Sequence, residues 1–75
     1  MIIKVLGPEI SISSANTVGN APLVRVFNTG ATAVLNIGST GNVTVTNTIA
    51  IIVEKQPTDT LTGTNMVAVP VAYKD

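Results

Sequence analysis

Valine, isoleucine and threonine recur at every second position along much of this chain. The segments Ile10-Ser11-Ile12-Ser13 and Val43-Thr44-Val45-Thr46 show the pattern most clearly. A two-residue period places successive side chains on opposite faces of a β-strand, and β-branched side chains pack well on a pleated surface. No stretch shows the 3.6-residue period of an amphipathic helix. The sequence therefore predicts an all-β fold.

The alternation, with glycine, asparagine and proline between the runs, predicts about seven short strands. They cover residues 2–6, 10–13, 22–28, 31–37, 43–46, 49–55 and 67–73. Short connections favour antiparallel pairing, because a parallel crossover needs a dozen or more residues. We expect a small antiparallel β-sandwich or barrel, in which residues 31–37 return along residues 22–28 as a hairpin after the turn at Gly30. The threonine-rich segment 57–65 is expected to be a loop.

Pro70 lies inside the last predicted strand. Proline has no N–H to donate to a strand ladder, so we expect this strand to lie at a sheet edge or to be bulged at Pro70. A long apolar edge strand promotes aggregation unless something covers it. Two interpretations remain open: Pro70 itself blunts the edge, or a neighbouring subunit covers the strand.

The chain has 75 residues and contains neither cysteine nor histidine. We expect one β domain over residues 1–75, and a domain this small is marginally stable unless a disulfide, a metal or a partner adds to its stability. The composition excludes disulfides and thiolate metal sites and removes the commonest transition-metal ligand. We therefore expect self-association or docking onto another protein, and we expect no cofactor and no metal.

Charged and aromatic side chains are too few for most active or binding sites. The chain has four basic and four acidic residues, zero net charge, and only Phe27 and Tyr73 as aromatic residues. Hydroxyl groups without a positioned base are weak nucleophiles, so we expect no catalytic residue and no enzyme. Nucleic-acid binding needs cations that neutralise phosphates, often beside stacking rings. The longest apolar run, residues 49–53, is far below the roughly 20 residues that span a bilayer. Neither nucleic acid nor membrane is an expected partner.

Seven residues are candidates for contact with a partner. Arginine and aromatic side chains are enriched at protein interfaces, which favours Arg25, Phe27 and Tyr73. Arg25 either lays its stem across the sheet, half-exposed, or anchors a carboxylate of a neighbour. Residues 55–59 are expected to be a strand end followed by a turn, with a polar rim contact as the alternative. Lys55 lies between Glu54 and Asp59 in the sequence, which indicates a solvated rim of salt bridges. The predicted interface residues are Arg25, Phe27, Lys55, Asp59, Val69, Pro70 and Tyr73.

Four segments carry a resemblance to a known group of proteins. They are Ile2-Ile3-Lys4-Val5-Leu6-Gly7, Leu23-Val24-Arg25-Val26-Phe27-Asn28 before a glycine turn, Glu54-Lys55-Gln56-Pro57-Thr58-Asp59, and Val69-Pro70-Val71-Ala72-Tyr73. The chain resembles short proteins encoded by marine tailed phages, especially those of cyanobacteria. The resemblance implies a virion structural protein, such as a capsid decoration (cement) protein or a small head or tail accessory protein. It implies no catalytic or ligand-binding residue.

The expected function is that of a capsid decoration protein, made in the host cytoplasm and bound to the capsid surface of the virion. It would stabilise the lattice of the major capsid protein, and repeated weak contacts across that lattice would act together. A head–tail, tail or fibre component is the alternative within the structural class. A host-surface or carbohydrate-binding module is the alternative outside it, which the scarcity of aromatic rings for sugar stacking disfavours.

Overall fold

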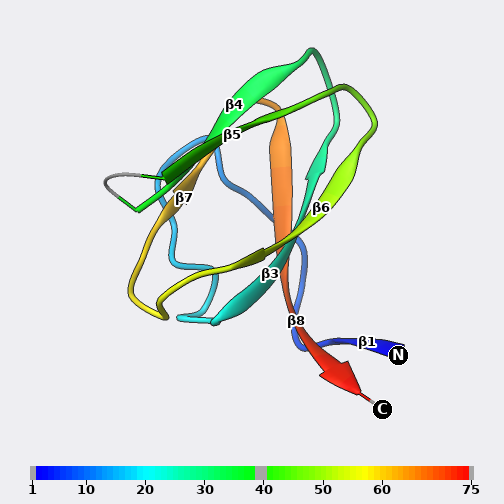
Figure 1. The fold of residues 1–75 in the computed structure, drawn as a ribbon, viewed down its shortest axis with the longest axis vertical. Helices are drawn as coiled ribbons and strands as arrows, with labels where there is room; N and C mark the ends of the chain where they lie inside the picture. Colours follow the sequence, from blue (N-terminus) through cyan, green and yellow to red (C-terminus); the bar gives the residue numbers. More distant parts are fainter. Residues whose placement is uncertain (1, 39–40, 75) are drawn as a thin grey trace.

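The computed structural model describes residues 2–38 and 41–74, which form strands and no helix. The strands are arranged in two antiparallel sheets, one of five strands and one of three (Figure 1). This confirms the predicted small all-β antiparallel fold, with one strand more than the sequence predicts. The strands are β1 (Ile2–Val5), β2 (Ile10–Ser11), β3 (Leu23–Asn28), β4 (Ala33–Ile37), β5 (Gly41–Val45), β6 (Ala50–Glu54), β7 (Leu61–Thr62) and β8 (Met66–Lys74).

The five-stranded sheet is built around β8. Its order is β1-β8-β3-β6, and β2 pairs with β8 as well. Residues 66–70 of β8 pair with β3, whereas residues 71–74 pair with β1. In Figure 1, β8 runs through the molecule in orange and red, and its end projects from the rest of the fold together with β1. We call this projecting pair, β1 with residues 71–74, the ribbon.

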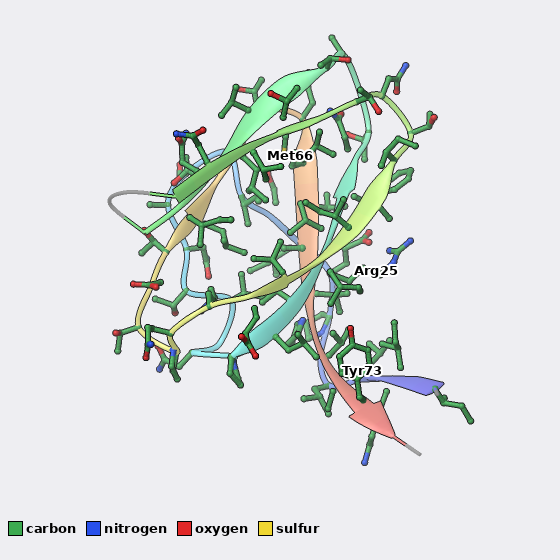
Figure 2. All side chains as sticks on the ribbon, in the orientation of Figure 1. Arg25, Met66 and Tyr73 are labelled. Carbon is green, nitrogen blue, oxygen red and sulfur yellow. The ribbon has the colours of Figure 1, made fainter. Side chains whose placement is uncertain are left out.

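The three-stranded sheet has the order β5-β4-β7 and packs on one face of the larger sheet. Val24 and Val26 of β3 share one core cluster with Leu35 of β4 and Val45 of β5. Met66 belongs to the same cluster, and Figure 2 shows it in the interior of the molecule. Burial of each such aliphatic side chain stabilises the fold by about 1.5–3 kcal/mol. The core therefore lies between the two sheets, as in a β-sandwich.

Residues 22–28 and 31–37 do not form the predicted hairpin, because β3 and β4 belong to different sheets. Asn28, fully buried at the end of β3, donates from Nδ2 to the carbonyls of Ala31 at 3.0 Å and Val45 at 2.8 Å. Its Oδ1 accepts a hydrogen bond from the Gly30 N–H at 2.8 Å. These bonds fix the turn against β5, so the chain crosses to the second sheet. The prediction was wrong because turn residues mark a change of direction and do not specify the pairing that follows.

Pro70 does not lie on an edge strand, since β8 has neighbours on both sides. The Pro70 carbonyl accepts a hydrogen bond from the Leu6 N–H at 2.8 Å. In an antiparallel ladder the nitrogen and oxygen of one residue point to the same side, so the Pro70 nitrogen also faces the segment 6–9. Pairing with β1 stops at Val71, and pairing with β2 resumes at Ala68. The partner strand is thus interrupted where Pro70 has no proton to donate.

β7 lies within the segment predicted to be a loop. Its Leu61 is fully buried, pairs with Ile37 of β4, and exchanges backbone hydrogen bonds of 2.8 and 3.1 Å with Asn16. A strand of two residues is too short to show a period in the sequence. Leu61 is held in place by its contacts with distant segments, which the local pattern does not reveal.

Candidate docking surface

One face of the five-stranded sheet is turned away from the core, and we call it the outer face. Directly paired residues of neighbouring strands project from the same face of a sheet. Arg25 is paired with Val69, and Phe27 with Val67. Along β8, Tyr73 projects from the same face as Val69, because every second residue shares a face. Figure 2 shows Arg25 and Tyr73 on the same side of β8.

The outer face is mostly apolar and only partly buried. Arg25, Phe27 and Val67 are half-buried, whereas Tyr73 is 51% exposed. Val69 is buried although it lies outside the core cluster between the sheets. The guanidinium carbon of Arg25 lies 5.8 Å from the centroid of the Phe27 ring, a cation–π contact. Arg25 thus lies beside Phe27 on the outer face, half-buried. A contact with a carboxylate of a neighbour stays a prediction.

The corresponding face of the three-stranded sheet is different in character. Its exposed residues are Val34 and Asn36 on β4 and Asn42 and Thr44 on β5. Apart from Val34, these carry amide or hydroxyl groups that water satisfies. The two outward faces therefore differ in polarity, and the face with Arg25 and Phe27 is the more apolar one.

The ribbon adds an apolar surface next to the outer face. All four residues of β1 are exposed, and Ile2 and Val5 are 62% and 61% exposed. Leu6, directly after β1, is 52% exposed. Within the ribbon, Val71 is buried, so the exposed apolar surface belongs mainly to β1 and Leu6.

Lys55 and Asp59 lie together in the turn after β6. Lys55 is only 7% exposed, and its Nζ donates to the carbonyls of Gln56 at 3.2 Å and Pro57 at 3.1 Å. Burial lowers the pKa of the Lys55 ammonium below its ordinary 10.5, and the negative charge of Asp59 partly opposes this effect. The prediction that Lys55 belongs to a solvated rim is wrong, because the side chain is buried against the carbonyl groups of the turn.

Asp59 closes the same turn. Its backbone N–H donates to the Gln56 carbonyl at 2.9 Å, and its Oδ2 accepts from the Gln56 N–H at 3.3 Å. A side chain at Gly38 would come within 3.2 Å of Asp59 Oδ1, and Gly38 has a φ of 63°. The turn therefore fits against a glycine whose backbone conformation disfavours other residues. Contacts within the turn hold both Lys55 and Asp59 in place.

The structure brings four of the seven predicted interface residues to one face: Arg25, Phe27, Val69 and Tyr73. Pro70 projects from the inner face instead, paired with Val24. A side chain at Gly7 would lie 3.3 Å from the Pro70 ring, so the segment 6–9 packs closely on it. Lys55 and Asp59 belong to the separate turn after β6. Whether any of these residues contacts a partner stays a prediction.

Sequence reasoning missed the exposure of β1. The strand itself is predicted, and the alternation of Ile3 and Val5 reads as one buried face of a sheet. In the structure both side chains are exposed, at 40% and 61%. The local pattern gives no indication of this exposure, because a nearly continuous apolar run such as Ile2, Ile3, Val5 and Leu6 is typical of a strand buried on both faces.

Within residues 2–38 and 41–74 there is no pocket, and no group of three or more acidic residues lies close enough to hold a metal ion. None of the described segments is a helix long and apolar enough to cross a membrane.

Comparison of the chain with models of protein families, with curated protein sequences and with solved structures found no match.

Proposed function

We propose that this chain is a virion structural protein, a capsid decoration protein that stabilises the lattice of the major capsid protein. The outer face of the five-stranded sheet, with Arg25, Phe27 and Tyr73, is the surface that docks, and Val69 is buried between these side chains. The location follows from the proposal: the protein is bound to the capsid surface of the particle.

The observation that carries the proposal is the contrast between the two outward faces. The ribbon and Tyr73 expose apolar side chains beside the half-buried Phe27 and Val67, whereas the other sheet presents Asn36, Asn42 and Thr44 to solvent around a single exposed Val34. A small domain with one apolar and one polar outward face is suited to lie on a larger protein with the polar face in water. Zero net charge lets many copies crowd on one lattice without strong mutual repulsion.

The resemblance to short proteins of marine tailed phages supports the choice of a virion as the larger assembly. A weak contact suffices there, because neighbouring sites on a lattice keep the local concentration of binding partners high. A head–tail, tail or fibre component would use the same surface on a different partner. We expect self-association as well, since the exposed apolar surface is available to other copies.

Quantitative mass spectrometry of purified particles tests the proposal. A decoration protein is present in numbers similar to those of the major capsid protein, whereas a tail or neck component is far rarer. Absence of the protein from particles overturns both the capsid decoration function and the head–tail, tail or fibre alternative. Specific binding of the isolated protein to glycans, together with that absence, would favour a carbohydrate-binding module instead.

A matched pair of variants tests which face docks. Tyr73→Glu introduces a charge on the outer face, at a residue that is 51% exposed, and Val34→Glu does the same on the polar face, at 48%. Burying an unpaired charge is costly, so Tyr73→Glu should weaken co-sedimentation with depleted particles about tenfold or more. Val34→Glu should bind like the unmodified protein. The reverse result would place the docking surface on the three-stranded sheet.

A further inference from the structure

The edge of β1 has a defined set of backbone groups available for a further strand. Leu6 directs its N–H to Pro70 in β8. Along an antiparallel strand, the backbone N–H and C=O groups of successive residues point alternately to one side and the other. The backbone groups of Lys4 therefore also face β8, whereas the backbone groups of Ile3 and Val5 point away from it. No strand of the described chain pairs with that side of β1. Two N–H and two carbonyl groups are thus free to form a ladder.

The side chains of β1 indicate what kind of strand would fit along its free edge. Ile3 and Val5 project from the outer face, beside Tyr73, since Ile3 is paired with Tyr73. Lys4 and Ile2 project from the opposite face, and all four residues are exposed. A strand added here meets exposed aliphatic groups on both faces and a single ammonium group at its centre.

We propose that β1 binds an extended acidic segment of the partner protein, which adds a strand antiparallel to β1 with an aspartate or glutamate opposite Lys4 and apolar residues on both sides. This deepens the proposed function, since it names the kind of segment through which the partner is held. Residues opposite Ile3 and Val5 form the hydrogen-bonded pairs. The carboxylate opposite Lys4 occupies the intervening pair, where side chains approach most closely.

Charge decides between this occupant and a second copy of the chain. If two copies of β1 paired antiparallel with Ile3 opposite Val5, Lys4 would lie directly opposite Lys4 of the second copy. Like charges directly opposite each other destabilise a strand pair, and opposite charges stabilise it. A lysine at the centre of an edge strand also disfavours indiscriminate edge pairing. Lys4 therefore selects against the chain itself and in favour of an acidic strand.

Titration of the full-length protein with short peptides tests the inference. The probe has a central glutamate, two valines on each side and threonines at the ends, and peptides with lysine or glutamine at the centre are the controls. Amide chemical shifts and hydrogen exchange report on Ile3 and Val5. We expect the glutamate peptide to bind and to protect both amides, about threefold to tenfold more tightly than the lysine peptide. Equal affinity for the two charged peptides overturns the role of Lys4.

Two variants make the test specific. Lys4→Glu should reverse the order of preference, so that the lysine peptide binds more tightly than the glutamate peptide. Ile3→Pro removes an outward N–H while leaving the ladder to β8 intact, and should abolish binding. Thr44→Pro is the matched control, because the Thr44 N–H points outward at the edge of the other sheet. Binding that survives Ile3→Pro, or is lost in Thr44→Pro with the fold intact, contradicts strand addition at β1.

The remaining outcomes separate this inference from the proposed function. If no peptide shifts the β1 amides at concentrations up to about 5 mM, well above a dissociation constant of about 1 mM, the edge is not a strand-binding site. In the protein alone, protection of the Ile3 and Val5 amides from hydrogen exchange that rises with protein concentration would show strand pairing between copies. That result would assign the edge to a second copy and overturn the inference, whereas association through side chains leaves these amides unprotected. Binding of the glutamate peptide by a protein absent from virions would support the edge site and refute the decoration function.

Discussion

The side-chain amide of Asn28 donates a 2.8 Å hydrogen bond to the backbone carbonyl of Val45, and these two residues belong to different sheets. The same side chain bonds to Gly30 and Ala31 in the turn that joins the sheets. Asn28 is fully buried, and no buried side-chain polar atom in residues 2–38 and 41–74 lacks a partner. One polar side chain thus links the two layers through an otherwise apolar interior.

Replacement of Asn28 should therefore be among the most damaging single changes. Asn28→Ala leaves the carbonyls of Ala31 and Val45 without their donor and should lower the free energy of unfolding by about 2–4 kcal/mol. Asn28→Asp keeps the shape but has no amide to donate, and it buries a carboxylate against two carbonyls. Urea denaturation measures both. Asn36→Asp, on the exposed polar face, is the control and should change the free energy of unfolding by about 0.5 kcal/mol or less. Equal urea midpoints for Asn28→Asp and Asn36→Asp would contradict the linking role of Asn28.

Val18 has a φ of 54° and is 1% exposed. A β-branched residue in the left-handed region is strained, and glycine relieves that strain. We therefore predict an inverted order: Val18→Gly should be at least as stable as Val18→Ala. At Val26, equally buried but in β3, glycine should be less stable than alanine by roughly 0.5–1 kcal/mol. Thermal or urea unfolding of the four variants measures both orders. The same order at both positions would show that the backbone at Val18 is not strained.

Gly63 has no room for a side chain. A methyl group there would come within 2.5 Å of Met66 Sδ, whereas at Gly19 nothing lies within 4 Å. Both Gly63 and Met66 are buried. Gly63→Ala should therefore force Met66 to repack and lower stability by about 1–3 kcal/mol. Gly19, with a φ of 66°, should lose about 1 kcal/mol on replacement with alanine, for a backbone reason alone.

The loss of stability expected for Gly63→Ala depends on Met66, whereas the loss expected for Gly19→Ala does not. Met66→Ala should remove most of the further loss caused by Gly63→Ala, which a double-mutant cycle in urea would measure. In the Gly19→Ala background, Met66→Ala should cost the same as in the unmodified protein. Strict additivity of Gly63→Ala and Met66→Ala would refute the steric explanation.

Lys55 gives the stability a specific dependence on pH. Its pKa is lower in the folded protein than the 10.5 of an unperturbed lysine, so at intermediate pH the unfolded chain binds more protons. The contribution of Lys55 to the free energy of unfolding therefore rises with pH between the two pKa values and levels off above about 10.5. Lys55→Met removes this titration, and Lys4→Met serves as the control for loss of one positive charge. The stability of the unmodified protein relative to Lys55→Met should increase as the pH rises toward 10.5; a decrease would be inconsistent with a buried ammonium.

The sequence predicts the strands well and the pairing poorly. Alternation identifies β3 and β8 with their correct faces, because the two-residue period is a property of each strand alone. The connection after Asn28 is assigned to the wrong sheet, because Asn28 acts through Val45, seventeen residues away. Pro70 misleads for a similar reason: the gap between β1 and β2 that accommodates it is not a local property. The same two-residue period places the candidate contact residues Arg25, Phe27, Val69 and Tyr73 on one face. The exposure of β1 cannot be predicted in this way, because it depends on which strand is left at the edge of the sheet.

The position of β8 has a consequence for how the protein folds. This strand is synthesised after all the others, yet it pairs with β1, β2 and β3. Until β8 leaves the ribosome, those three strands lack the neighbour that completes their ladders, and Val24 and Val26 lack Met66 and Ala68 of their core cluster. Pairing of segments far apart in sequence also slows folding. These strands should therefore complete their fold only once β8 has left the ribosome, and slowly for their number of residues, so a nascent chain that still lacks β8 should depend on a chaperone.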